Sequence, residues 1–249
     1  MKLFAIALLA ANVFSSALAA PRFGDYTHVA RNNGGGNGGG PAYNRLNKDD
    51  AALLIIDHQT GLTSLVRDME PADFKTQVVA FADMGRFFNL PTILTTSRDD
   101  GPNGPMIPEI LAMYPNATII QRPGQINAWD NEDFVNAVKA TGKKQLIVSG
   151  IVTEVCVAFM TLSAIEAGYE VFVVTDASGT FNDVSRESSW LRMQAAGAQL
   201  VTFFAAACEL ARDWRSDLQG LTDFFMAHIP EYATVIQSFQ GAVASVQGH

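Results

Sequence analysis

Six short runs of apolar, largely β-branched residues recur between residues 51 and 203. Within each run the apolar residues stand on consecutive positions, which is typical of strands buried on both faces of a parallel sheet. Between most of the runs, apolar residues recur at spacings of three and four, as they do along one face of a helix. The six runs are 51–56, 92–96, 118–121, 145–148, 171–175 and 199–203.

This alternation predicts an α/β domain whose parallel strands are joined by right-handed crossovers. The helical spacings fall at 74–88, 134–138, 157–166, 191–195 and 208–214. The last of these predicts that Cys208 opens the last large helix. In such a sheet the ligand site lies at the carboxyl ends of the strands, so the residues that follow each strand are the candidates for chemistry.

The first twenty residues have the pattern of a secretory signal peptide. Lys2 precedes an apolar stretch at 3–14 that only Asn12 interrupts, and an Ala-x-Ala pattern ends at Ala19. The stretch is too short to cross a bilayer core of about 30 Å. We therefore expect cleavage near Ala19 or Ala20, and a secreted, extracellular protein that is not attached to a membrane after cleavage.

A run of glycine and asparagine occupies residues 32–40. Such a run is costly to order and buries nothing, so it is typical of a flexible linker. A phosphate-binding glycine loop would need a strand before it and a helix after it, and neither is predicted here. We assign residues 21–45 to this linker and 46–249 to one globular domain.

Composition and charge exclude several classes of protein. A hydrophobic share of 48% excludes a disordered chain, and a net charge of −8 argues against a nucleic-acid partner. Two cysteines are too few for a disulfide-rich scaffold or a four-cysteine zinc site. The four histidines show no metal-ligand spacing, and no dinucleotide or nucleoside-triphosphate motif occurs. We therefore expect neither a metal nor a cofactor.

Asp57, Arg122 and Cys156 each follow or end a predicted strand. Alone, each has a plain structural explanation: a turn residue, an ion pair and a small buried side chain. Together they offer a proton acceptor, a cation and a nucleophile at one edge of the sheet. A helix N-terminus favours the thiolate of a cysteine beside it. With Arg122 acting the same way and only Asp57 opposing, we expect the Cys156 pKa to lie below about 8.5.

The chain resembles the isochorismatase-like cysteine hydrolases, most closely the branch related to YcaC. The motifs that carry this resemblance are IIDHQ, TTS, GPNGP, RPGQINAWDN, GIVTEVCV, VVTDASGTFN and ACELARDWR, and it covers roughly residues 46–232. It implies a three-layer α/β/α fold around a six-stranded, mostly parallel sheet. It also implies a homo-oligomer that cleaves C–N bonds of small amides through a thioester, using an Asp–Lys–Cys triad.

Carried onto this chain, the resemblance makes Asp57 the family aspartate and Cys156 the nucleophile. It implies a non-proline cis peptide at Ile151–Val152 that turns the amides of Val152 and Cys156 inward as an oxyanion hole. Arg122 stands where most of the family has lysine. Because arginine stays protonated in proteins, Asp57 would have to serve as both base and acid.

Family nicotinamidases place a metal-binding histidine two residues after the aspartate, where this chain has Gln59. We therefore expect no zinc, and we expect His58 to be structural and oriented by a backbone carbonyl. Gln59, Asn127, Trp129 and Phe181 are candidates for lining the substrate pocket. For Asn127 and Trp129 the alternative is a polar loop that the tryptophan anchors to the body.

Two other functions fit the same fold. A vinyl-ether hydrolase would act on a chorismate-like acid, but the family members with that activity typically lack the cysteine. A non-catalytic binding or scaffold protein would tolerate Arg122. The segments 221–225 and 229–232 could dock on a neighbouring subunit or pack on their own domain. Cys208 could be a buried hydrophobe or could pair with Cys156.

Overall fold

The computed structural model describes residues 44–247, all within one compact unit. The predicted signal peptide, and all of the predicted linker except its last residues, lie outside the described residues. No helix within the described range is long and apolar enough to cross a membrane.

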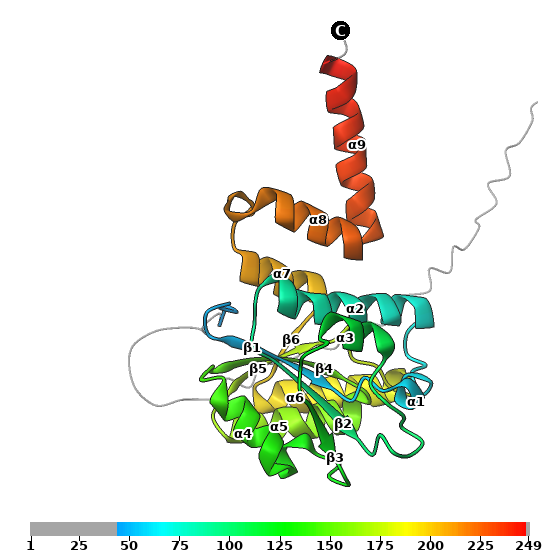
Figure 1. Ribbon diagram of the computed structural model, residues 1–249, viewed down its shortest axis with the longest axis vertical. Helices are drawn as coiled ribbons and strands as arrows, with labels where there is room; N and C mark the ends of the chain where they lie inside the picture. The colour runs from blue at the N-terminus through cyan, green and yellow to red at the C-terminus, as the bar shows by residue number, and fades with distance from the viewer. Residues whose placement is uncertain (1–43, 248–249) are drawn as a thin grey trace, which may run out of the picture. The chain divides into compact units, whose positions relative to one another are not determined.

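Six parallel strands form the central sheet (Figure 1). They are β1 (Ala51–Ile56), β2 (Thr92–Ser97), β3 (Ile119–Arg122), β4 (Gln145–Gly150), β5 (Glu170–Val174) and β6 (Gln199–Val201). Their order across the sheet is β3-β2-β1-β4-β5-β6. All six coincide with the predicted runs to within two residues at each end, and the predicted α/β class is confirmed.

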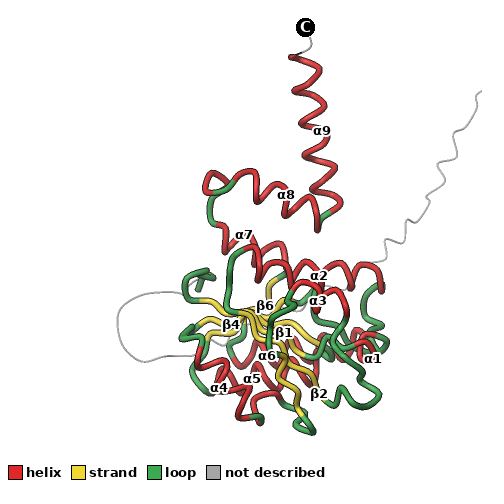
Figure 2. The backbone as a smooth tube through the Cα atoms, in the orientation of Figure 1, coloured by secondary structure: helices red, strands yellow, loops and turns green. Residues whose placement is uncertain are grey.

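Helices cover both faces of the sheet and follow most of the strands (Figure 2). The helices are α1 (Thr60–Thr63), α2 (Pro71–Phe87), α3 (Pro108–Met113), α4 (Glu132–Ala140), α5 (Ala158–Glu166), α6 (Asp183–Ala196), α7 (Phe203–Ala211), α8 (Leu218–His228) and α9 (Pro230–Gln247). Two short 3-10 turns, η1 (Ala128–Asp130) and η3 (Trp214–Ser216), and a π-helical turn, η2 (Thr153–Val157), complete the described elements.

Successive residues of β1 divide the core into two layers. Leu53 and Ile55 pack with α2, α7 and α8, whereas Leu54 and Ile56 pack with α4, α5 and α6. All are fully buried, as the unbroken apolar run of this strand predicts for a sheet covered on both faces. The result is the three-layer α/β/α fold that the resemblance implies.

The last large helix does not open at Cys208, so that prediction is wrong. The helix α7 begins at Phe203, because the Thr202 side chain caps it by accepting a hydrogen bond from the backbone of Ala205. Cys208 lies inside this helix, which ends at Ala211 and is followed by Arg212, a residue with a positive φ of 66°. Two further helices, α8 and α9, then follow.

The segment 221–225, one of two with a possible docking role, packs on its own domain. Leu221, Phe224 and Phe225 of α8 are buried in the layer that α2 and α7 share. Phe224 stacks on Phe87 with ring centroids 4.5 Å apart. This segment therefore offers no free apolar surface to a neighbour.

Candidate active site

The strand order reverses between β1 and β4, which creates the crevice where open α/β sheets bind ligands. Ile56 and Gly150 are register partners at the carboxyl ends of these strands. Asp57 follows β1 directly, and the turn η2, which carries Cys156, follows β4. Neighbouring strands therefore bring the predicted base and the predicted nucleophile to the same place.

Arg122 reaches this crevice from the end of β3, two strands away from β1. Neighbouring strands lie about 4.8 Å apart, so the side chain has to cross roughly 10 Å. Its guanidinium donates to Asp57 Oδ2 at 2.6 Å and to Thr95 Oγ1 of the intervening strand at 3.4 Å, while Nε donates to the Gln125 carbonyl at 3.2 Å. Both side chains of the ion pair are fully buried, so water does not screen it.

Asp57 sits in a tight turn with a left-handed backbone (φ 54°), a conformation that aspartate tolerates better than most residues. Burial raises the pKa of its carboxyl to about 6, although Arg122 and the Cys156 thiol both act to lower it. Within residues 44–247, Oδ1 meets no N–H or O–H donor. One carboxylate oxygen is thus held by Arg122, and the other is available to accept a proton.

The Cys156 thiol has a raised pKa, so the expectation of a lowered pKa is wrong. Burial is the largest cause, since the residue is only 9% exposed, and repulsion by Asp57 and a hydrogen bond to it add to the effect. Arg122 and the backbone N–H of Val152 favour the thiolate without offsetting these causes. At rest the site therefore holds a neutral thiol beside a carboxyl group that is paired with arginine.

A non-proline cis peptide joins Ile151 and Val152, as the resemblance implies. Cys156 follows in η2, whose π-helical hydrogen bonds distinguish this turn from a regular helix start; such turns are frequent at functional sites. The Val152 N–H points at the Cys156 sulfur. The oxyanion hole formed by the amides of Val152 and Cys156 stays a prediction.

Gln59 is buried, and its amide is fully engaged with the backbone. Its Nε2 donates to the carbonyls of Ser97 at 3.0 Å and Gly104 at 2.5 Å, and its Oε1 accepts from the Ser97 N–H at 2.8 Å. These bonds tie the segment 101–105 to the end of β2. Gln59 therefore holds this segment in place, and its role in lining a substrate pocket stays a prediction.

Asn127 and Trp129 contact the protein in the way the polar-loop alternative describes. The Asn127 side chain accepts from the Trp129 N–H at 3.1 Å and donates to Ser163 Oγ at 3.0 Å. The Trp129 ring packs edge-on against Tyr169, with centroids 5.6 Å apart. Phe181, in contrast, is 44% exposed after β5. A direct role of these residues in lining a substrate pocket stays a prediction.

His58 is buried beside the site and faces a backbone carbonyl, as expected. Its Nε2 lies 3.1 Å from the Ala177 carbonyl and 3.1 Å from Ser149 Oγ. Burial lowers its pKa to about 4, so the ring is neutral at physiological pH. Within residues 44–247, no three His, Cys, Asp or Glu side chains are grouped as a metal site would require.

Cys156 and Cys208 are both free thiols. Cys156 packs in the layer with α4, α5 and α6, whereas Cys208 packs against the layer on the other face of the sheet. The sheet therefore separates them, and the hydrophobe interpretation of Cys208 is the one that the structure matches.

Sequence reasoning overlooked two neighbours of the site. Thr95, which bonds the Arg122 guanidinium, opens the TTS motif near the carboxyl end of β2, and that position was the available signal. Glu154, two residues before the cysteine, accepts a hydrogen bond from the Thr180 hydroxyl and so links η2 to the segment after β5. Only its place in the GIVTEVCV motif pointed to it.

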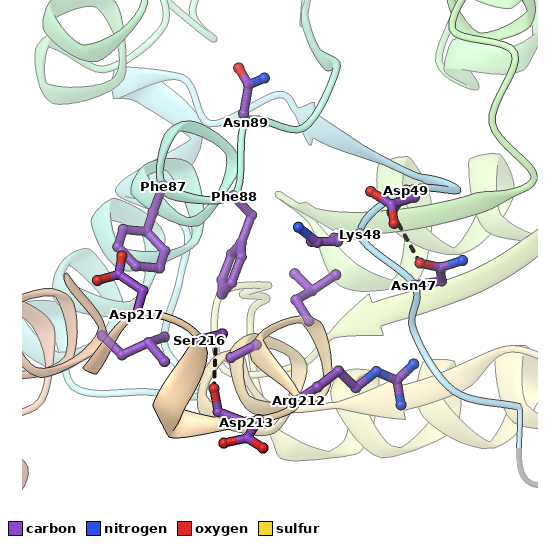
Figure 3. Close-up of a pocket in the computed structure, with 13 residues that line it drawn as sticks. Asn47, Lys48, Asp49, Phe87, Phe88, Asn89, Arg212, Asp213, Ser216 and Asp217 are labelled. Carbon is purple, nitrogen blue, oxygen red and sulfur yellow. Dashed lines mark hydrogen bonds between the residues drawn. The ribbon is translucent and has the colours of Figure 1, made fainter. Parts of the chain in front are cut away.

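A cavity of about 600 Å³ lies near the amino end of β1, whereas the candidate active site lies at the carboxyl end of that strand (Figure 3). Asn47 and Lys48, which precede β1, form one side of it, and Phe87, Phe88 and Asp217 form the other. Six residues of β1 span about 20 Å, so this cavity lies far from Asp57. It is separate from the candidate active site.

Comparison with known proteins places these observations in a family. The sequence pattern of the Isochorismatase domain matches residues 51–203. The probable hydrolase YcaC of Escherichia coli is 63% identical over 197 residues, which are 79% of this chain and 95% of that protein. Its crystal structure, described as an octameric hydrolase of unknown specificity, superposes with a TM-score of 0.80 at 62% identity and covers 82% of this chain and 100% of its own.

Two further relatives extend the comparison. YcaC from Pseudomonas aeruginosa, solved with hexane-2,5-diol and covalent acrylamide, is 64% identical with a TM-score of 0.79, covering 81% of this chain and 100% of its own. Nicotinamidase 3 of Arabidopsis thaliana is 27% identical over 178 residues, which are 62% of this chain and 86% of that protein.

Proposed function

The chain belongs to the isochorismatase family, and we propose that it is a cysteine-dependent hydrolase that cleaves the C–N bond of a small amide through a thioester. One observation carries the proposal: at the switch point of the sheet, Asp57 contacts Arg122 through one oxygen and interacts with the Cys156 thiol. A carboxylate that can accept the thiol proton is the neighbour that covalent catalysis by a cysteine needs, and this supports the proposal.

In the acylation step, the Cys156 sulfur attacks the amide carbonyl carbon while its proton passes to Asp57. The carbonyl oxygen becomes an oxyanion. In this proposal the backbone N–H groups of Val152 and Cys156 bind it by donating hydrogen bonds. Asp57 then gives the proton to the departing nitrogen. The C–N bond breaks, the amine or ammonia leaves, and a thioester remains on Cys156.

In the deacylation step, a water molecule attacks the thioester carbon and passes a proton to Asp57. The C–S bond then breaks, the carboxylic acid leaves, and the sulfur recovers the proton from Asp57. Each turnover therefore consumes one amide and one water and returns the site to its starting state. No cofactor takes part in this cycle.

Arg122 positions the base in both steps. Its bond to Asp57 Oδ2 keeps the carboxyl ionised in a site where burial alone would favour the protonated form. Because arginine does not release its proton, Asp57 carries the proton alone. The pKa of about 6 suits a group that must both take and return a proton near neutral pH.

The relatives support this proposal in two ways. Thiolates add covalently to electrophiles such as acrylamide, so the covalent acrylamide in the relative from P. aeruginosa favours a nucleophile in a protein 64% identical to this one. A nicotinamidase, whose name denotes amide hydrolysis, is also among the relatives. The identity of the substrate is left open, as it is for the octameric relative from E. coli.

The test is the release of ammonia from a panel of small primary amides by the purified chain. We expect Cys156→Ala to abolish release and Cys156→Ser to be nearly inactive, because Asp57 is too weak a base to activate a hydroxyl well. Cys208→Ser is the matched control and should retain the full rate, since Cys208 lies on the other face of the sheet.

Two results would overturn the proposal. Ammonia release that survives in Cys156→Ala would show that amide cleavage does not need the thiol, as when water attacks the carbonyl carbon directly. A folded wild-type chain that hydrolyses no amide in the panel would favour a binding or scaffold role on the same fold.

A further inference from the structure

Thr180 follows β5 and uses all of its polar groups in hydrogen bonds. Its backbone N–H donates to Asp68 Oδ1 at 2.8 Å, and its carbonyl accepts from the N–H groups of Arg67 at 2.8 Å and Asp68 at 3.3 Å. Its hydroxyl donates to the Glu154 carboxylate. The residue is fully buried. Thr180 therefore joins the chain that precedes α2 to the turn η2, which carries Cys156.

The side of this connection that lies in the body of the domain is held firmly. The Asp68 side chain is fully buried, and its carboxylate lies 3.7 Å from the Arg186 guanidinium, which also donates to the Asp68 carbonyl at 2.8 Å. Gly179, next to Thr180, is packed so closely that a Cβ there would lie 2.7 Å from the Val66 side chain. Thr180 is therefore a fixed point against which the neighbouring turn can be positioned.

The turn η2 has few side-chain contacts that fix its geometry. Turns of this π-helical kind are rare, and η2 starts without a side-chain cap at Val152. The Thr153 hydroxyl meets no partner within residues 44–247, although the Thr153 N–H donates to the Gly179 carbonyl at 3.1 Å. The Glu154 side chain ties η2 to the segment after β5, two residues before Cys156.

We propose that the hydrogen bond between Thr180 and Glu154 holds the Cys156 thiol in place for reaction. Thr180 is then a positioning residue, and this inference rests on the proposed function. Asp57 reaches the thiol from the end of β1, where its bond to Arg122 holds it independently of η2. A shift of η2 therefore changes the distance between the thiol and its base. A misplacement of about 1 Å can lower a rate about 100-fold.

The alternative is that this hydrogen bond only stabilises the fold. Its loss would then lower the free energy of unfolding and leave the folded enzyme with its normal kcat. A positioning role predicts instead a folded variant with a lower kcat and little change in KM, because the bond acts on the reacting thiol and not on the binding of substrate.

The test compares kcat and KM of Thr180→Val and Thr180→Ser on the amide that the wild type hydrolyses fastest. Valine keeps the shape of threonine without the hydroxyl, whereas serine keeps the hydroxyl. We expect kcat to fall by about 10- to 100-fold in Thr180→Val and to be largely retained in Thr180→Ser. Thr175→Val is the matched control and should keep the full rate, because the Thr175 hydroxyl donates to the Val201 carbonyl at 3.1 Å and not to η2.

Variants of Glu154 test the same bond from its other end, and they serve also if Thr180→Val does not fold. Glu154→Gln keeps an oxygen that can accept from the hydroxyl, and Glu154→Met removes it. We expect Glu154→Met to lower kcat as Thr180→Val does, and Glu154→Gln to keep most of the rate. In the double variant Thr180→Val, Glu154→Met the two losses should not add, because both changes remove one bond.

Alkylation of Cys156 by iodoacetamide separates this inference from the proposed function, since it needs no substrate. The hydrogen bond to Asp57 helps to raise the pKa of the thiol. A displaced thiol should therefore be alkylated with a midpoint at lower pH in Thr180→Val than in the wild type or Thr175→Val. If that midpoint shifts while the wild type hydrolyses no amide, the amide chemistry is contradicted and the positioning of the thiol is supported.

Far-UV circular dichroism checks that each variant is folded. An unchanged alkylation midpoint in folded Thr180→Val and Glu154→Met would overturn the inference, whether or not the wild type hydrolyses an amide. So would an unchanged kcat in the same folded variants of an active enzyme. Equal losses in Glu154→Gln and Glu154→Met would also overturn it, because glutamine retains the acceptor.

Discussion

Replacement of Arg122 by methionine is expected to destabilise the folded chain strongly, and more so at higher pH. The ion pair with Asp57 is 2.6 Å long and fully buried. Removal of one partner of such a pair costs about 3–5 kcal/mol, because the other charge stays buried without compensation. At an m value of about 2 kcal/mol/M, the urea midpoint would fall by about 2 M.

The pH dependence follows from the pKa of Asp57. In the folded wild type this pKa is raised from 3.8 to about 6. The contribution of this raised pKa to the free energy of unfolding is fully present at pH values below the pKa of the unfolded chain, and it is lost as the pH rises through about 6. A shift of two pKa units amounts to about 3 kcal/mol. Without Arg122 the pKa rises further, so the variant protonates Asp57 at pH 5 and escapes most of the cost it bears at pH 8.

Urea unfolding at fixed protein concentration, at about pH 5 and about pH 8, measures the effect. Arg86→Met is the matched control, because Arg86 makes an exposed ion pair with Asp83 at 3.2 Å and such pairs contribute about 0–1 kcal/mol. The double variant Asp57→Asn, Arg122→Met should recover much of the loss, since it leaves no unpaired buried charge. An equal loss at both pH values, or a loss no larger than that of Arg86→Met, would refute this reasoning.

Three further outcomes are expected. First, kcat/KM should rise with pH and level off above about 6, because Asp57 must be ionised to accept the thiol proton; a pH-independent rate would contradict its role as base. Second, Asp57→Asn should move the midpoint for alkylation of Cys156 by iodoacetamide to lower pH, since the carboxylate raises the thiol pKa, while turnover is lost; an unchanged midpoint would show that burial alone sets the pKa. Third, we propose that the chain is exported, so N-terminal sequencing of protein from the culture fluid should find a start near Ala20 or Pro21, and recovery of only the full-length chain inside cells would count against it.

The sequence predicted the sheet well because fully buried strands leave an unmistakable pattern. Consecutive apolar residues such as those of 51–56 are typical of a strand covered on both sides, and β1 occupies those residues. The apolar spacing alone predicts a helix start near Cys208, five residues too late, because it does not include the residue that caps the helix. Thr202 supplies that cap through its side chain, and a Ser or Thr before an apolar run is a signal that a sequence does contain.

The sequence predicts which residues come together at the candidate site, but it does not predict their pKa values. Strand topology alone brings Asp57 and Cys156 together, and the length of an arginine side chain allows Arg122 to reach them. The expected direction of the Cys156 pKa shift was wrong because burial, its largest cause, is a property of the tertiary structure. The same holds for Gln59, whose partners Ser97 and Gly104 lie about forty residues away along the chain, a pairing that no local pattern encodes.

The covalent intermediate on Cys156 is the most direct test of the proposed function. The chain is mixed with the amide of the panel that it hydrolyses fastest, quenched in acid within one turnover, digested and analysed by mass spectrometry. The proposal predicts one acyl group on the peptide that carries Cys156, released by hydroxylamine as thioesters are, and none in Cys156→Ala. An acyl group on Cys208 or any other residue, or full turnover by Cys156→Ala, would contradict it.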